Sequence, residues 1–107
     1  MKLNEYLKAL DKVLMNPNRL LIVSILYLFG PKKESEIVKA LNMPWGTFSS
    51  HITILEREGY IKRKRIFTRK GYRTFIKLTE EGEENYKKLV KLLREFLKYV
   101  REEYDGK

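Results

Sequence analysis

Apolar residues recur at helical spacing over five segments of the chain and alternate with polar residues over two shorter segments. The first segment predicts a helix over residues 2–14. A second helix is expected from Pro17 to about Phe29, because Asn16 can cap it and proline suits the first helical position. This second helix is apolar on nearly every face, which is typical of the central element of a core.

Two shorter helical patterns follow. Ser35 is expected to cap a helix that runs through Leu41, and Asn42 suits the left-handed conformation that ends it. Pro44 begins a further helix over about residues 45–58. Two short helices joined by about three residues form a helix-turn-helix pattern. The buried face of the second of them is expected to hold Phe48, Ile52 and Leu55.

After this helix the pattern changes from helical to extended. Residues 60–67 and 72–78 are rich in β-branched and aromatic side chains, and residues 68–71 supply a turn that contains glycine, so we expect a β-hairpin. Thr79 then caps a final helix that runs to about Tyr104. These elements predict an α+β, mainly helical fold with about five helices and a two- to three-stranded sheet.

Most of the net positive charge lies between Arg57 and Lys77. This stretch holds nine Lys or Arg residues and one acid, Glu58, so it accounts for +8 of the net charge of +9. Clustered cations suit a polyanion, because each neutralised phosphate releases condensed counterions. A solvated, solubilising surface is the alternative. Alternate strand residues point to opposite faces, so two of the four basic residues at 62–65 are expected to be ordinary solvated charges.

The composition excludes several classes of function. The 107 residues suffice for one domain, and the absence of Cys removes disulfide and thiolate chemistry. A single His offers no imidazole cluster, so neither a metal nor a cofactor is expected. Carboxylates are not paired in an apolar setting and no Gly-rich phosphate loop is present, so we do not expect an enzyme.

The sequence also bears on location. The N-terminal residues lack the apolar segment of a signal peptide, and the longest apolar run, residues 20–29, is too short to span a bilayer. We therefore expect a cytoplasmic protein without membrane contact. Gln is absent whereas Lys, Glu and Arg are abundant, a bias typical of hyperthermophile proteins.

Three stretches of the chain form a recognisable series: NPNRLLIVSIL, SEIVKALNMPWGTFSSHITILEREGYI and RTFIKLTEEG. The series resembles the small winged helix transcriptional regulators related to the MarR and ArsR groups, from Asn16 to Gly82, about two thirds of the chain. A serine-histidine pair, a leucine four residues later and the closing Leu-Thr-Glu-Glu-Gly are its most specific parts in combination. The resemblance implies a winged helix-turn-helix fold and a regulator that binds specific double-stranded DNA, usually as a homodimer.

In such regulators the helix at about residues 45–58 is the recognition helix, which lies in the major groove. Short hydroxyl side chains can contact base edges and phosphates. Because they do not make bidentate base contacts, sharper discrimination would come from Arg57, from the wing or from DNA shape. The expected DNA-contacting residues of this helix are Trp45, Thr47, Ser49, Ser50, His51, Thr53 and Arg57.

Two of these positions have two interpretations each. Trp45 either packs against the core or the helix end, or contacts a sugar-phosphate or a thymine methyl group. His51 is either a partly buried structural residue or a phosphate contact. A metal-binding role for His51 is not expected, because the chain has no second His and no Cys.

The basic turn at about residues 68–73 corresponds to the wing, which contacts an adjacent groove or its phosphates. Its expected DNA-contacting residues are Arg69, Lys70, Tyr72 and Arg73. A protein that binds DNA in this way would be associated with the nucleoid.

The final helix has more apolar surface than one small core needs, and its expected length is about 37 Å at 1.5 Å per residue. Within a single domain, residues 1–107, we therefore expect residues 1–14 and 80–104 to be dimerisation helices. A twofold dimer predicts a pseudo-palindromic DNA site. The expected interface residues are Leu3, Tyr6, Leu7, Leu10, Tyr86, Leu89, Leu93, Phe96 and Val100.

Two other binding functions fit part of the sequence. The basic hairpin alone would suit a non-specific architectural or chromatin protein, and the fold would suit an interaction module of the transcription apparatus. The polar outward face of the helix at 45–58 favours a specific regulator, because an electrostatic binder would place Lys or Arg there. Nothing in the sequence marks a site for a small-molecule effector.

Overall fold

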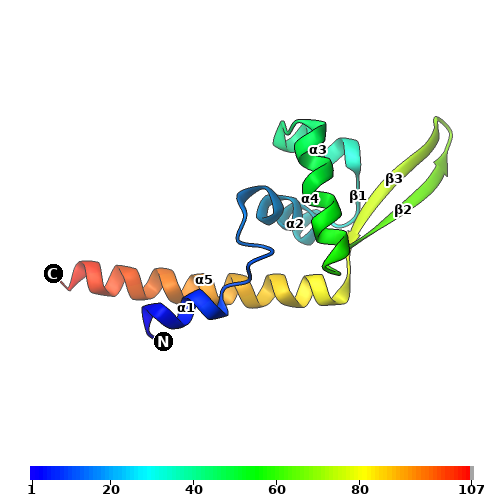
Figure 1. Ribbon diagram of the computed structural model, residues 1–107. Helices are drawn as coiled ribbons and strands as arrows, with labels where there is room; N and C mark the ends of the chain where they lie inside the picture. Colours follow the sequence, from blue (N-terminus) through cyan, green and yellow to red (C-terminus); the bar gives the residue numbers. More distant parts are fainter. Residues whose placement is uncertain (107) are drawn as a thin grey trace.

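The computed structural model describes residues 1–106, which form five helices and one three-stranded antiparallel sheet. In chain order the elements are α1 (Leu3–Ala9), α2 (Pro17–Phe29), β1 (Lys32–Lys33), α3 (Glu34–Leu41), α4 (Trp45–Arg57), β2 (Ile61–Thr68), β3 (Gly71–Leu78) and α5 (Glu80–Asp105) (Figure 1). The predicted α+β, mainly helical class is confirmed.

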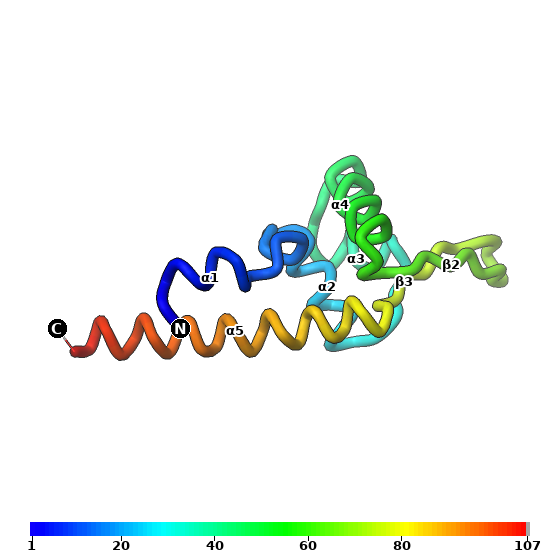
Figure 2. Tube along the Cα trace, turned by 60° about the horizontal axis from the view of Figure 1, so that its bottom comes forward, coloured from blue at the N-terminus to red at the C-terminus, as the bar shows by residue number. Residues whose placement is uncertain are grey.

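The molecule is elongated, with principal extents of 60 × 25 × 22 Å. The β2–β3 hairpin projects from one end of the body and the last turns of α5 from the other (Figures 1 and 2). Among residues 1–106, no helix combines the length and the apolarity needed to cross a membrane.

The second helix begins and ends where the sequence predicts. Oδ1 of Asn16 accepts hydrogen bonds from the backbone N–H groups of Asn18 (3.0 Å) and Arg19 (3.2 Å), and Pro17 occupies the first turn. Gly30 ends the helix with a φ of 77°, a conformation that glycine adopts without strain. Only one side of α2 is buried, however. Its buried residues are Ile22, Val23 and Leu26, whereas Leu21, Leu28 and Phe29 are exposed.

The first helix is shorter than predicted. It ends at Ala9, although the apolar spacing continues to residue 14. Oδ1 of Asp11 accepts a hydrogen bond from the backbone N–H of Leu14 (2.9 Å), and Oδ2 accepts one from the hydroxyl of Tyr60 (2.5 Å). Asp11 therefore stabilises a separate turn that buries Leu14, in place of a continued helix.

The helix-turn-helix consists of α3 and α4. The N-cap of α3 is Lys33 and not Ser35, because β1 pairs with β3 and fixes an earlier start. The backbone N–H of Lys33 donates to the Glu36 carboxylate at 3.0 Å, which further stabilises that start. Asn42 ends α3 in the left-handed conformation, with a φ of 48°, as predicted. The predicted buried face of α4, Phe48, Ile52 and Leu55, is confirmed.

The hairpin has a regular antiparallel register. Residues 69–70 form the turn, Ile61 pairs with Leu78 at the base, and Phe67 pairs with Tyr72 beside the turn. The short β1 pairs with the other edge of β3, so the strand order is β1-β3-β2.

One face of the hairpin is turned toward the helices. It is formed by the odd-numbered residues of β2 and the even-numbered residues of β3, because paired residues share a face and alternate residues change face. At its base, Ile61 and Ile76 are buried in the core. Further along it, Arg63 reaches both α3 and α4.

Thr79 joins α5 to the end of α4. Its hydroxyl accepts a hydrogen bond from the backbone N–H of Gly82 (2.9 Å) and donates one to the carbonyl of Gly59 (2.6 Å). A Cβ atom at Gly82 would overlap the carbonyl oxygen of Tyr60. The Leu-Thr-Glu-Glu-Gly sequence is thus a packing motif that fixes the direction of α5.

Three residues expected at a dimer interface are buried within their own chain: Tyr6, Tyr86 and Leu89. Tyr6 packs edge to face on Phe96, with ring centroids 5.2 Å apart, so α1 covers part of α5 (Figure 2). The hydroxyl of Tyr86 lies 2.8 Å from Oγ of Ser24 in α2. These three side chains stabilise the single chain and offer little surface to a second copy.

Candidate nucleic-acid interface

The outward face of α4 carries the short polar side chains that the sequence analysis singled out. Its exposed residues are Trp45, Ser49, Ser50, Thr53 and Arg57, and Thr47 is half-buried. Because the opposite face is anchored in the core, α4 presents these groups on a rigid support. Arg57 extends into solvent, with Nε 3.6 Å from the Glu58 carboxylate.

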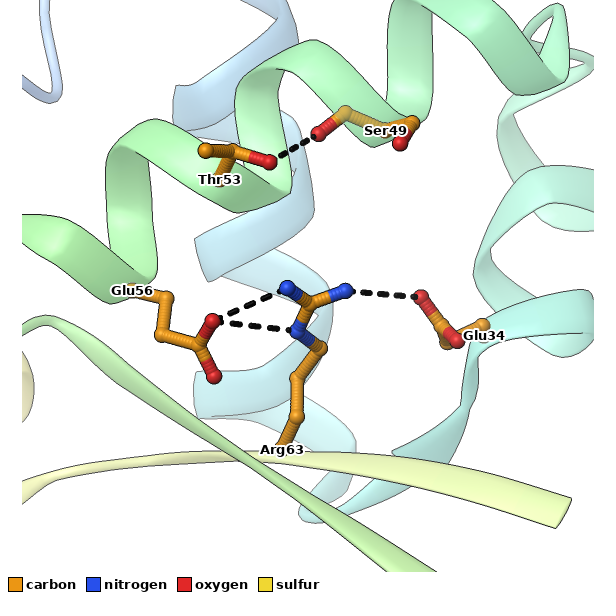
Figure 3. Close-up of polar contacts among 5 residues, drawn as sticks. All are labelled: Glu34, Ser49, Thr53, Glu56 and Arg63. Atoms are coloured by element: carbon orange, nitrogen blue, oxygen red, sulfur yellow. Dashed lines mark hydrogen bonds and ion pairs between the residues drawn. The ribbon is translucent and has the colours of Figure 1, made fainter.

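Two of the hydroxyl groups have a defined orientation. Oγ1 of Thr53 donates to the carbonyl of Ser49 at 2.9 Å (Figure 3), and Oγ of Ser50 donates to the carbonyl of Gly46 at 3.1 Å. Since each hydroxyl hydrogen is directed into the helix, its oxygen lone pairs remain as acceptors. Acceptors suit the amino groups that cytosine and adenine present in the major groove.

Trp45 packs against the helix end and remains largely exposed, which bears out the packing interpretation. Its ring packs edge to face on Phe48, with centroids 5.8 Å apart, yet 56% of the residue is exposed. Trp45 also lines a small surface hollow of about 150 Å³ together with Ser35 of α3 and Tyr72 of β3. The start of α4 and the wing therefore border one continuous surface.

His51 is half-buried and is held by α2. Nδ1 lies 3.0 Å from Nη1 of Arg19, and Nε2 lies 3.2 Å from the side-chain amide of Asn18. A guanidinium only donates, so a hydrogen bond from Arg19 requires Nδ1 to accept, which favours the neutral imidazole. Burial, and then the Arg19 charge, lower the pKa of His51 below its ordinary value. This geometry matches the structural interpretation of His51.

The wing places its basic groups at and beside the turn. Arg69 and Lys70 are exposed in the turn itself. Nη1 of Arg73 donates to the carbonyl of Tyr72 at 2.8 Å, so this guanidinium is turned back along the ribbon. The aromatic ring of Tyr72 is exposed on the face that is turned toward α4.

A charged contact that was not anticipated connects the wing to the helix-turn-helix. Arg63 of β2 points between Glu56 of α4 and Glu34 of α3 (Figure 3). Nη2 lies 2.9 Å from Oε1 of Glu56, and Nη1 lies 4.0 Å from Oε2 of Glu34. The hydrogen bond from Arg63 lowers the pKa of Glu56, while the same bond raises the pKa of Arg63. Arg63 therefore positions the wing relative to α4.

The four basic residues at 62–65 divide as strand alternation predicts. Lys62 and Lys64 lie on the face turned away from the helices, and Arg63 and Arg65 lie on the other. The guanidinium carbon of Arg65 sits 4.7 Å from the centre of the Tyr72 ring, a cation–π contact. Arg65, and Phe67 on the same face, were not among the predicted site residues. Both share the Tyr72 face, as the register of the two-residue turn at 69–70 shows.

No metal-binding arrangement of three His, Asp or Glu residues occurs among residues 1–106. The surface formed by α4 and the wing carries short polar and basic side chains, together with the Glu56 carboxylate that pairs with Arg63. They form one side of the molecule, suited to an extended anionic surface with hydrogen-bonding groups.

Comparison with known proteins agrees with this geometry. Residues 18–97 match the family of winged helix DNA-binding domains. A search of curated protein sequences found no match. Among solved structures, a transcriptional regulator homologue from Pyrococcus horikoshii OT3 is 31% identical, with a TM-score of 0.82 over 92% of this chain and 95% of the other.

More distant structures share the fold. The homodimeric winged helix-turn-helix DNA-binding domain of Mb0332 from Mycobacterium bovis is 22% identical, with a TM-score of 0.70 over 91% of this chain and 86% of the other. A regulator from Enterococcus faecalis V583 assigned to the MarR family is 17% identical, with a TM-score of 0.79 over 98% and 94%. The family match and the Pyrococcus structure together show that this chain belongs to the winged helix DNA-binding transcriptional regulators.

Proposed function

We propose that this protein is a homodimeric regulator that recognises specific double-stranded DNA. In this proposal α4 lies in the major groove, and the wing contacts an adjacent groove or its phosphates. The observation that carries the proposal is the exposed row of Ser49, Ser50 and Thr53 on a helix that is fixed to a basic hairpin by Arg63. Uncharged acceptors on the helix provide base discrimination, and the hairpin provides charge.

The arrangement of the two elements supports simultaneous contact. Trp45 and Tyr72 line the same hollow, so the N-terminal end of α4 and the wing face a common ligand. The β2–β3 hairpin extends beyond the body (Figure 1), and the exposed Arg69 and Lys70 of its turn would reach phosphates that α4 does not. Phosphate contacts fix the register on the duplex, and base contacts then select the sequence.

The terminal helices support a dimer. Helix α5 has 26 residues, about 39 Å at 1.5 Å per residue, and it continues past the body. Its second half exposes Leu97, Val100 and Tyr104, and α1 exposes Leu3 and Leu7. The related domain of Mb0332 is itself a homodimer. We therefore assign residues 80–104, with the exposed side of α1, to pairing of two copies within a one-domain protein.

The DNA proposal is tested by competition. A duplex selected by the full-length protein from a random pool is labelled, and binding is measured against excess random duplex at about 0.2 M salt. We expect the selected duplex to remain bound. Loss of all preference would instead favour a non-specific architectural protein.

A variant of the helix tests the assignment of α4. Thr53→Val keeps the size of the side chain but removes the acceptor oxygen, so it should alter which sequences are selected. Glu84→Gln, at an exposed position of α5 away from α4, is the control and should leave the selected sequence unchanged. Equal losses of affinity on every sequence would refute the recognition role of α4.

The dimer is tested by sedimentation at micromolar concentration. We expect the wild-type chain to sediment as a dimer, and Leu97→Glu to sediment as a folded monomer because it places a charge in the apolar stripe of α5. Leu28→Glu, on the exposed side of α2, is the control. A monomeric wild-type protein would contradict the dimer but not DNA binding.

A further inference from the structure

Two exposed aromatic rings stand side by side at the tip of the wing. Phe67 and Tyr72 are directly opposite in the sheet register, and their ring centroids are 5.2 Å apart with an angle of 71° between the planes. Phe67 is 71% exposed and Tyr72 is 57% exposed. Both lie beside the turn of the hairpin, which projects from the body (Figures 1 and 2), so burial in the fold does not explain them. Clustered exposed apolar groups mark a contact surface.

The pair supports the hairpin, but that role does not require Phe67 to be aromatic. A threonine would satisfy the strand preference at this position without exposing a ring. Tyr72, in contrast, is also held by the guanidinium of Arg65 at 4.7 Å. Tyr72 is thus a fixed support, and Phe67 is the ring that projects beside it.

The rings are directed toward the same side as the recognition helix. Phe67 and Tyr72 belong to the hairpin face that carries Arg63 and, at its base, Ile76. Tyr72 also borders the hollow that Trp45 lines. A duplex that lies along α4 would therefore meet this aromatic pair and not the opposite, lysine-bearing face.

The charges around the pair indicate the chemistry of its partner. Arg65, Arg69 and Lys70 are exposed within a few residues of Phe67 in sequence. Cations on both sides of an apolar ring suit nucleic acid, because the cations can contact backbone phosphates while the ring contacts the bases between them. We propose that Phe67, supported by Tyr72, is a wedge that enters the minor groove next to the recognition site and partly unstacks one base step. This inference rests on the proposed binding of duplex DNA.

The wedge has two consequences for the DNA. A ring inserted from the minor groove opens a step and bends the duplex toward the major groove, by roughly 20–90° in known cases. Pyrimidine–purine steps such as TA and CA unstack most easily, so the site should favour one of them beneath the wing. The wing then adds sequence preference as well as charge.

The experiment uses the full-length protein and a short duplex that it selects from a random pool. 2-Aminopurine is placed at successive positions along that duplex, because its fluorescence rises when the base unstacks. Dyes at the two ends report bending by energy transfer. For the wild-type protein we expect a fluorescence rise confined to one step under the wing, together with a shorter distance between the ends.

Two variants isolate the ring. Phe67→Thr should abolish the fluorescence rise and the bend and weaken binding about tenfold. Its salt dependence should match the wild type, because no cation is removed. Ile66→Thr changes the adjacent residue on the opposite face and should retain the rise and the bend. The wild-type measurement stands by itself if a variant fails to fold.

The outcomes separate this inference from the proposed function. If the wild-type protein binds the selected duplex but no 2-aminopurine position responds, the wedge is refuted and the regulator proposal stands. If no duplex is preferred or bound, both are refuted. Equal loss of the rise in both variants would show that Phe67 acts through hairpin stability. Tighter binding to single-stranded than to duplex DNA would assign the rings to a single-strand platform and also refute the wedge.

Discussion

Nη2 of Arg63 lies 2.9 Å from Oε1 of Glu56, so a strand of the wing is hydrogen-bonded to α4 (Figure 3). Both side chains are partly exposed. A pair in such a setting contributes about 0–1 kcal/mol to stability. Its main effect is therefore geometric, since it fixes the angle between α4 and the charged hairpin.

Arg63→Ala should weaken specific DNA binding more than Lys64→Ala does. Each variant removes one positive charge from β2, so the loss of long-range attraction is the same. Arg63→Ala also frees the wing from α4, which should cost about a further fivefold in affinity for the selected duplex. Fluorescence anisotropy measures both affinities. Equal losses would show that Arg63 contributes its charge and not its position.

The basic turn should set the salt dependence of binding. Replacing Arg69 and Lys70 together by Ala should reduce the slope of log affinity against log salt by about 2, because each phosphate contact contributes about 0.9. Replacing Lys62 and Lys77, which pair on the opposite face, removes the same charge and should change the slope less. The reverse order would place DNA on the other face of the hairpin.

Much of the fold could be predicted because the ends of several helices are determined by side chains close to them in sequence. The caps at Asn16 and Thr79 and the left-handed Asn42 act within a few residues, and all three have the predicted roles. The errors come from long-range contacts. Asp11 interrupts the first helix by binding Tyr60, and the pairing of β1 with β3 moves the start of α3.

The candidate site also has features that follow from local sequence and features that depend on long-range packing. The polar face of α4 follows from helical spacing alone, and so does the exposure of Ser49 and Thr53. The partners of His51 lie in α2, 32 and 33 residues away in sequence, so only the packed structure identifies them. For Phe67 the register opposite Tyr72 follows from the two-residue turn at 69–70, which the structure shows and the expected turn over residues 68–71 did not specify.

Acidification should destabilise the protein through His51. Its folded pKa is lowered by burial and by Arg19, whereas an unfolded histidine titrates near 6.5. The unfolded chain therefore binds the proton more readily. The contribution of neutral His51 to the free energy of unfolding is thus present above about pH 6.5 and is lost as pH falls through the folded pKa. The melting temperature should fall between pH 7.5 and pH 5.5. In His51→Gln this pH-dependent fall should be smaller.

The same histidine gives a direct control. It is the single His of the chain, so one imidazole signal in the NMR spectrum reports its titration. We expect the midpoint of that titration in the folded protein to lie below 6.5. A midpoint at or above 6.5 would contradict the contact with Arg19, because a guanidinium at 3.0 Å opposes the imidazolium form.

The close approach of Gly82 to Tyr60 predicts a large effect of one methyl group. In Gly82→Ala the added Cβ would overlap the Tyr60 carbonyl, which is a backbone group and cannot move away. We therefore expect the free energy of unfolding to fall by about 3 kcal/mol. Gly46→Ala is the matched control, because Gly46 also lies in a helix but its Cβ would meet open space. That variant should gain about 0.5–1 kcal/mol from helix propensity. Urea unfolding measures both, and losses of similar size would show that helical glycines, and not this contact, determine the effect.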